Sequence, residues 1–155
     1  MPVSLETRSR PTNLQPPRII DIPTKVDSMG DLSFVEAEDI VPFEIRRTYF
    51  ITGIPALARR GGHAHKDLFE FIIAVHGAFT VKLQDQEGNE HEFRLDSPAK
   101  GLFVDSLYWR ELFDYDEGSA CLVLASNHYD EADYLRDFDE FLQYRAQGDA
   151  PGTSQ

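Results

Sequence analysis

The fold of this chain is decided by the stretch Arg59-Arg60-Gly61-Gly62-His63-Ala64-His65-Lys66. Histidines at positions i and i+2 of a β-strand project from the same face, because successive side chains alternate between its two faces. Four residues separate His65 from Glu70, and six separate Glu70 from Gly77. Two imidazoles gathered with a carboxylate indicate a functional pocket, which could hold a metal ion or perform metal-free acid–base chemistry.

The spacing His-x-His-x4-Glu-x6-Gly is that of the first cupin motif, in which a small β-barrel points these side chains into its mouth. Around this motif, short strand-like runs alternate with turn signals. Residues Ala78–Leu83 alternate between apolar and polar, and a turn at Gln86–Asn89 leads to a further run at His91–Leu95. We therefore predict a mainly β fold, a cupin (double-stranded β-helix, jelly-roll) barrel.

The apolar period changes near the C-terminus, where apolar residues recur at intervals of three and four from Tyr134 onward. This period predicts a short amphipathic helix from Glu131 to Ala146, packed on the outside of the barrel. Residues 1–17 are polar and rich in proline and predict a disordered leader, and residues 147–155 predict a flexible tail. A single cupin domain is expected over residues 18–146.

The composition excludes several classes of partner. The net charge of −12 argues against nucleic acid, because phosphate backbones need a basic surface. No apolar run approaches the length that spans a bilayer, and the N-terminus lacks the apolar core of a signal peptide, so we expect a soluble, cytoplasmic protein. Cys121 is the only cysteine and lies in an apolar run, which predicts a buried, inert thiol.

The charge is distributed unevenly. From Asp105 to the C-terminus there are twelve acidic residues and three basic ones. Between positions 43 and 66, Glu44 is the only acidic residue. The basic residues of that segment are Arg46, Arg47, Arg59, Arg60 and Lys66. A basic patch beside the histidines of an acidic protein suits a small anionic ligand such as a phosphorylated metabolite, although a solvated barrel rim would have the same composition.

Two kinds of chemistry fit the histidine motif. Metal-binding cupins take a further histidine ligand from a later strand, but Arg110 stands at the corresponding position, and a guanidinium has no lone pair to offer. His63, His65 and Glu70 could still form a facial triad with open positions. In metal-free proton transfer, a histidine removes a proton next to a carbonyl, while Tyr49 and arginine side chains bind the developing oxyanion.

Longer stretches carry a resemblance to a known family. RRGGHAHK, preceded by PFEIRRTYFI at 42–51, resembles the nucleotide-sugar 3,4-ketoisomerases, which are cupins that act on TDP-4-keto-6-deoxyglucose. LDSPAKGLFVDSLYWREL at 95–112 and LVLASNHYDEADYLRDFDEF at 122–141 look like the same family. Family members often carry Gln in place of Glu70 and His in place of Arg110.

The resemblance implies a function and a set of residue roles. The enzyme would move the carbonyl of a TDP-4-keto-6-deoxyhexose from C4 to C3 through an enediol(ate), without a cofactor, for the biosynthesis of 3-amino-dideoxy sugars. His63 would be the base at C3, His65 would help the proton reach C4, and Tyr49 would bind a sugar oxygen. Substrate binding is assigned to Arg59, Arg60, Arg110 and Lys66.

The resemblance also implies a homodimer, in which an N-terminal strand at Arg18–Ile22 could pair with the partner. Three alternative functions fit the same residues. A nucleotide-sugar epimerase would keep the carbonyl at C4, a metal-dependent cupin enzyme would use His63, His65 and Glu70, and a non-catalytic protein would bind the sugar nucleotide without turning it over.

Overall fold

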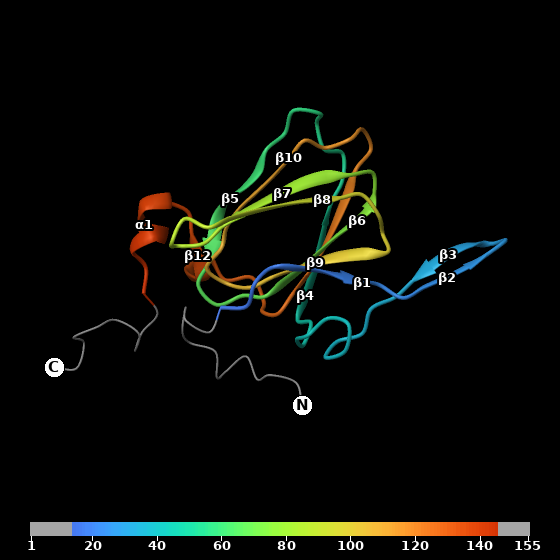
Figure 1. The fold of residues 1–155 in the computed structure, drawn as a ribbon, viewed down its shortest axis with the longest axis horizontal. Coiled ribbons are helices and arrows are strands. Elements are labelled where there is room, and N and C mark those ends of the chain that lie inside the picture. The colour runs from blue at the N-terminus through green and yellow to red at the C-terminus, as the bar shows by residue number, and fades with distance from the viewer. Residues whose placement is uncertain (1–13, 146–155) are drawn as a thin grey trace.

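The computed structural model describes residues 14–145, which form two facing antiparallel sheets of five strands each (Figure 1). The strands are β1 (Arg18–Asp21), β2 (Thr24–Asp27), β3 (Gly30–Ser33), β4 (Arg47–Ile51), β5 (Arg60–His65), β6 (Glu70–His76), β7 (Phe79–Gln84), β8 (Glu90–Leu95), β9 (Lys100–Val104), β10 (Trp109–Phe113), β11 (Ala120–Ala125) and β12 (Tyr134–Leu135). One sheet has the order β1-β9-β6-β11-β4 and the other β12-β5-β10-β7-β8. The mainly β, cupin-like architecture predicted from the sequence is confirmed.

Alternation along the central strands builds the interior between the two sheets. In β6, Ile72 and Ala74 point between the sheets and pack with side chains of β7, β9, β10 and β11. Phe71 and Ile73 point the other way, into a second apolar cluster on the outer face, which the segment 41–43 covers. Strand β6 is therefore apolar on both faces, and Glu70 is a buried charge at its first position.

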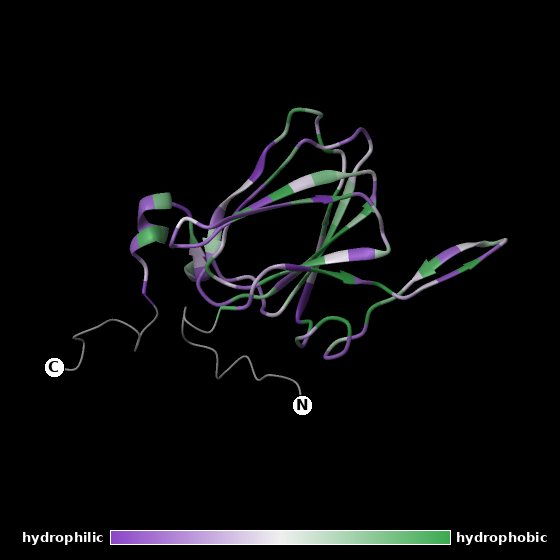
Figure 2. Cartoon of the chain, viewed as in Figure 1, coloured by the Kyte–Doolittle hydropathy of each residue, from purple (hydrophilic) through white to green (hydrophobic). Residues whose placement is uncertain are grey.

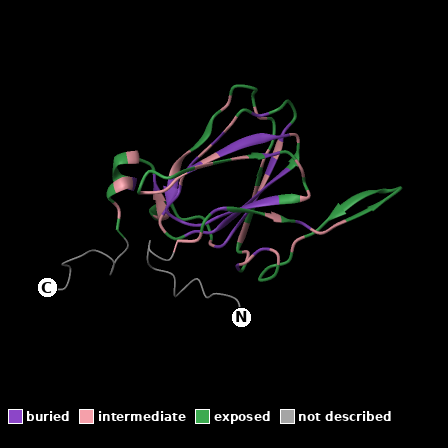
Figure 3. Ribbon diagram, in the orientation of Figure 1, coloured by how far each residue is buried: buried purple, intermediate pink, exposed green. Residues whose placement is uncertain are grey.

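Strands β2 and β3 form a separate hairpin that projects from the barrel (Figure 1). Nearly every residue of the two strands is exposed, as Figure 3 shows. The exposed side chains include three large apolar ones, Val26, Met29 and Leu32. Such a surface is unusual for a part of a protein that meets only water.

The C-terminal segment differs from the predicted helix. Residues Glu131–Asp133 form a single 3₁₀ turn, η3, and the helix α1 is restricted to Phe138–Gln143. Between them, β12 pairs with His65 and Ala64 of β5. A helix is present in the predicted segment, but it is shorter than predicted. The pairing of β12 with β5 takes the place of the first predicted helical turns, and Asp137 caps α1 at its N-terminus. Figure 2 shows the hydrophobic and hydrophilic sides of α1.

The N-terminal part of the described chain lies against the barrel. Residues 14–17, assigned from the sequence to a disordered leader, precede β1, and the Gln15 N–H donates to the carboxylate of Asp105 at 2.8 Å. The rest of that leader and the predicted tail lie outside the described residues. Within residues 14–145, no helix is long and apolar enough to cross a membrane.

Candidate active site

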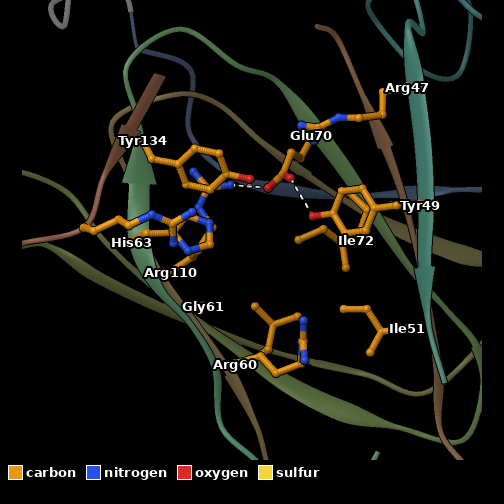
Figure 4. Close-up of a pocket in the computed structure, with 13 residues that line it drawn as sticks. Arg47, Tyr49, Ile51, Arg60, Gly61, His63, Glu70, Ile72, Arg110 and Tyr134 are labelled. Carbon is orange, nitrogen blue, oxygen red and sulfur yellow. Dashed lines mark hydrogen bonds and ion pairs between the residues drawn. The ribbon is translucent and has the colours of Figure 1, made fainter. Parts of the chain in front are cut away.

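A cavity of about 330 Å³ is lined by most of the predicted site residues (Figure 4). Its size is within the range of pockets that bind small molecules. Both sheets contribute to its lining, which consists of Arg47, Tyr49, Ile51, Arg60, Gly61, His63, Glu70, Ile72, Arg110, Leu112, Val123, Tyr134 and Arg136. Five residues singled out from the sequence are therefore brought together here, namely Tyr49, Arg60, His63, Glu70 and Arg110.

The two glycines before His63 form a bulge in β5. The pairing with β10 shifts register there, with Arg110 opposite His63 and Glu111 opposite Gly61. Gly61 and Gly62 have φ angles of +88° and +69°, in the left-handed region that favours glycine. A Cβ atom on Gly61 would lie 2.5 Å from the carbonyl oxygen of Arg110. The Gly-Gly pair thus permits the close approach of β10 that sets His63 opposite Arg110.

His63 is the imidazole that faces the cavity. Burial, followed by the positive charge of Arg110 and the proximity of His65, lowers the pKa of His63 to about 4. Its Nδ1 atom is buried without a hydrogen-bond partner of good geometry in the described part of the chain. His63 is therefore a neutral imidazole at neutral pH, which is the form of a general base.

Glu70 lies at the centre of a buried group of three residues. Its carboxylate accepts one hydrogen bond from Arg110 Nη1 at 2.5 Å and another from the Tyr49 hydroxyl at 2.9 Å (Figure 4). We call Tyr49, Glu70 and Arg110 the inner cluster. Burial alone would raise the pKa of Glu70, but the charges of Arg110 and His65 and the Tyr49 hydrogen bond lower it overall. Burial and then the charge of Glu70 raise the pKa of Tyr49, so this phenol keeps its proton.

His65 lies behind His63 and does not line the cavity. Only 1 % of its surface is exposed, and its ring packs edge-on against His63 with centroids 4.9 Å apart. Its Nδ1 atom is 2.9 Å from Oδ2 of Asp133. Direct contact with a ligand in the cavity thus falls to His63 rather than to His65.

Two of the predicted substrate-binding residues lie outside the cavity lining. The Arg59 guanidinium lies 4.2 Å from the centroid of the Phe113 ring and forms an ion pair with Glu111. Lys66 lies over the ring of Tyr144 and lines a separate, more open cavity. The basic patch read from the sequence is therefore divided, with Arg47 and Arg60 in the cavity lining and Arg59 and Lys66 outside it.

Three lining residues with polar or charged side chains were not predicted as site residues, namely Arg47, Tyr134 and Arg136. Arg47 belonged to the basic patch noted in the sequence, and its Nε atom is buried without a hydrogen-bond partner among residues 14–145. Tyr134 and Arg136 were not considered as site residues because their segment was predicted to be a helix on the outside of the barrel. The stretch 122–141 that resembles the ketoisomerases contains both and was the signal that could have identified them.

Arg136 belongs to a second group of the same three residue types. It makes two hydrogen bonds to Glu131, at 2.7 and 2.9 Å, and Glu131 also accepts from the Tyr129 hydroxyl at 2.7 Å. We call Tyr129, Glu131 and Arg136 the outer cluster. The Arg136 guanidinium lies 4.1 Å from the centroid of the Tyr134 ring, at the edge of the cavity.

The residues at this site do not fit the metal centre that many cupins contain. Both oxygens of Glu70 are occupied, by Arg110 and by Tyr49. Arg110, which cannot be a ligand, is a permanent positive charge beside any dication. Among the described residues, no group of three or more His, Cys, Asp or Glu side chains has the geometry of a metal site.

Comparison with known proteins gives one consistent picture. Residues 15–146 match the family described as "WxcM-like, C-terminal" (FdtA). The TDP-4-oxo-6-deoxy-α-D-glucose-3,4-oxoisomerase of Aneurinibacillus thermoaerophilus is 39 % identical over 130 residues, which cover 83 % of this chain and 92 % of that protein.

Two solved structures illustrate the structural similarity. A mutant of the 3,4-ketoisomerase QdtA from Thermoanaerobacterium thermosaccharolyticum, in complex with TDP-4-keto-6-deoxyglucose, is 36 % identical with a TM-score of 0.78 and covers 81 % of this chain and 91 % of its own. The TDP-quinovose 3,4-ketoisomerase WlaRB from Campylobacter jejuni is 37 % identical with a TM-score of 0.79, covering 83 % and 98 %.

Proposed function

Since this chain belongs to the WxcM-like, C-terminal (FdtA) family, we propose that it is a TDP-sugar 3,4-ketoisomerase. It moves the carbonyl of a TDP-linked 4-keto-6-deoxyhexose from C4 to C3, for the biosynthesis of 3-amino-dideoxy sugars. The observation that carries this proposal is His63, a neutral imidazole in the wall of a cavity that also holds a protonated tyrosine and several arginines. A base beside oxyanion-binding donors is what an enolisation requires.

The proposed reaction begins at C3 of the sugar, whose hydrogen is acidic because it is α to the C4 carbonyl. His63 removes this proton, and the electron pair moves onto the C4 oxygen to give an enediol(ate). The C3 hydroxyl gives up its proton and the C4 oxygen takes one, so the return of a proton to C4 places the carbonyl at C3 and leaves a hydroxyl at C4. Tyr49, whose raised pKa keeps it a donor, hydrogen-bonds a sugar oxygen, and His65 supports His63 from behind.

The diphosphate is bound by arginines at the cavity. The buried Nε of Arg47 has no hydrogen-bond partner in the described part of the chain, and a buried donor of this kind is costly unless a ligand satisfies it. Arg60 and Arg136 also line the cavity and add two further positive charges. Arginine is well suited to this task because its fork matches phosphate oxygens.

Incubation with TDP-4-keto-6-deoxyglucose in D2O, followed by NMR of the sugar, tests the function. Migration of the carbonyl with deuterium at C4 supports the isomerase. Deuterium at C3 or C5 with the carbonyl still at C4 would instead identify an epimerase, and an unchanged sugar that binds would identify a non-catalytic binder.

Two histidine variants, one in the cavity and one at the surface, test the role of His63 as the base. His63→Asn should abolish carbonyl migration, because no other imidazole in the described chain lines the cavity. His76→Asn is the matched control, since His76 is exposed at the end of β6. Full turnover by His63→Asn would exclude His63 as the base.

We also propose that the enzyme is a homodimer, with a second copy of the chain covering the β2–β3 hairpin. Val26, Met29 and Leu32 are 75 %, 93 % and 60 % exposed on this projecting element. Strand β1, which leads into the hairpin, is an edge strand among the described strands and pairs there only with β9. Val26→Asp combined with Leu32→Asp should convert the dimer to a monomer in analytical ultracentrifugation, whereas a wild-type monomer would refute the proposal.

A further inference from the structure

Asp133 connects the inner histidine to the surface of the protein. Its Oδ2 atom is 2.9 Å from Nδ1 of His65, and its Oδ1 atom accepts the Asp67 N–H at 2.8 Å. Its backbone carbonyl also accepts the Lys66 N–H at 2.8 Å. These three contacts fix the carboxylate beside His65, on the side away from the cavity.

The same segment brings Asp133 into contact with the catalytic wall. The next residue, Tyr134, pairs with His65 in the sheet, and its ring lies 4.5 Å from the ring of His65 and 5.0 Å from that of His63. His63, His65 and Tyr134 therefore form one contiguous group of rings. Any change in the orientation or protonation of His65 acts directly on His63.

We propose that Asp133 is a positioning residue for the isomerisation, which acts by fixing the tautomer of His65; this inference rests on the proposed function. A carboxylate only accepts hydrogen bonds, so Nδ1 of His65 carries the proton in this contact. In the neutral ring, Nε2 then keeps its lone pair. A proton that passes through His65 during the C3-to-C4 transfer arrives at Nε2 and leaves from Nε2, while the Nδ1–H stays bonded to Asp133.

The carboxylate also stabilises the imidazolium that forms while His65 holds this proton. The contact is strong because His65 is 1 % exposed and the Asp133 side chain is 18 % exposed, which limits screening by water. Asp133 never touches the substrate in this scheme. Its substitution should therefore change turnover more than substrate binding.

The test uses Asp133→Asn in the full-length protein. The amide oxygen can still accept the Asp67 N–H, but the amide nitrogen then faces Nδ1 of His65 and donates to it, which moves the ring proton to Nε2. Asp130→Asn is the matched control in the same turn, because asparagine caps η3 as aspartate does and Asp130 does not contact His65.

Two measurements separate positioning from structural damage. In histidine-labelled protein, ¹⁵N NMR should show the Nδ1–H tautomer of His65 in the wild type and the Nε2–H tautomer in Asp133→Asn, with the signal assigned by its loss in His65→Gln. The kcat of Asp133→Asn should fall by about 10²-fold while its KM stays within about twofold of wild type. Asp130→Asn should match the wild type in both measurements.

An unchanged tautomer, or a kcat of Asp133→Asn within about twofold of wild type, would overturn the inference. Partial recovery of kcat in Asp133→Glu, which restores a carboxylate, would support it. A wild type that moves no carbonyl would overturn the proposed function itself, while the NMR measurement would still decide whether Asp133 fixes the tautomer of His65.

Discussion

The inner and outer clusters contain the same three residue types in two different environments. In each, a glutamate accepts hydrogen bonds from one arginine and one tyrosine. The side chains of Arg110 and Glu70 are 2 % and 3 % exposed, whereas those of Arg136 and Glu131 are 53 % and 57 % exposed. The pKa of the glutamate is lowered in both clusters.

The difference in exposure means that similar hydrogen bonds contribute differently to stability in the two clusters. In the inner cluster, two charges have been removed from water, so each depends on its partner, and the loss of either leaves an uncompensated charge. In the outer cluster, water and salt can replace either partner. We therefore expect the inner cluster to control folding and the pKa of His63, and the outer cluster to affect the substrate alone.

The largest effect is expected from Arg110→Met. This substitution leaves the carboxylate of Glu70 buried without its cation and should lower the free energy of unfolding by about 3–5 kcal/mol. Urea denaturation followed by circular dichroism measures the change. Arg136→Met is the matched control and should leave the urea midpoint unchanged within error, since its partner is exposed. An equal loss of unfolding free energy in Arg110→Met and Arg136→Met would contradict the expected difference between the inner and outer clusters.

A double substitution sharpens this result. In Glu70→Leu/Arg110→Met both charges are absent, so the double variant should be more stable than Arg110→Met alone. A double variant as unstable as the single one would show that packing around Arg110, rather than the unpaired charge, causes the loss.

The tyrosines of the two clusters give the second comparison. Tyr49→Phe removes a buried hydrogen bond to a charged group and should cost about 1.5–3 kcal/mol. Tyr129→Phe removes the equivalent bond at the surface and should not shift the unfolding midpoint measurably. Urea midpoints at a constant m-value measure both changes. A larger loss of stability in Tyr129→Phe than in Tyr49→Phe would contradict the expectation that the inner cluster contributes more to folding.

The sequence predicted the inner cluster better than the outer one. The cupin spacing predicted that His63 and Glu70 share a pocket, and both line the cavity of the structure. Arg110, which stands where the sequence analysis looked for a third ligand, forms an ion pair with Glu70. The similarity to known 3,4-ketoisomerases confirms the predicted family. These features depend on spacing within a motif, which sequence patterns preserve.

What the sequence missed depends on contacts between distant segments. The run Trp109–Phe113, which forms β10, was not among the strands predicted from the sequence. Arg110 places a charge at a buried position of this strand, and the compensating Glu70 lies 40 residues away in the chain. Tyr134 fits a helical period equally well, and only the pairing of β12 with β5 makes it part of the cavity. Asp133 was overlooked for the same reason.

The third prediction concerns pH and the effect of the inner cluster on His63. A base acts only when it is deprotonated, and burial and Arg110 lower the pKa of His63 to about 4. In the free enzyme, kcat/KM should therefore stay level from neutral pH down to about pH 5 and fall about tenfold per pH unit below 4. Circular dichroism at each pH controls for unfolding.

A half-maximal rate already near pH 6.5, the ordinary pKa of histidine, would show that the environment of His63 does not lower its pKa. Because Arg110 is buried, added salt should not change the pH at which kcat/KM falls. Arg136→Met should move this pH dependence little, since burial and the charge of Arg110 are the largest causes of the lowered pKa of His63. The interaction of His63 with Glu131 is only a minor cause of the lowered pKa of that glutamate.

The smallest effect is expected from Arg136→Met on the substrate. This arginine lines the cavity but is half exposed, so its attraction for a diphosphate is screened by water, and its loss should raise KM by about threefold with kcat unchanged. Steady-state kinetics at low salt and in about 0.5 M NaCl measure the effect, which should disappear at high salt because the Debye length shrinks to a few Å. Arg46→Met, which removes an exposed arginine outside the cavity lining, is the control. A fall in kcat, or a KM effect that persists at high salt, would mean that Arg136 acts on the reacting sugar as a buried residue does, and the distinction between the two clusters would then rest on stability alone.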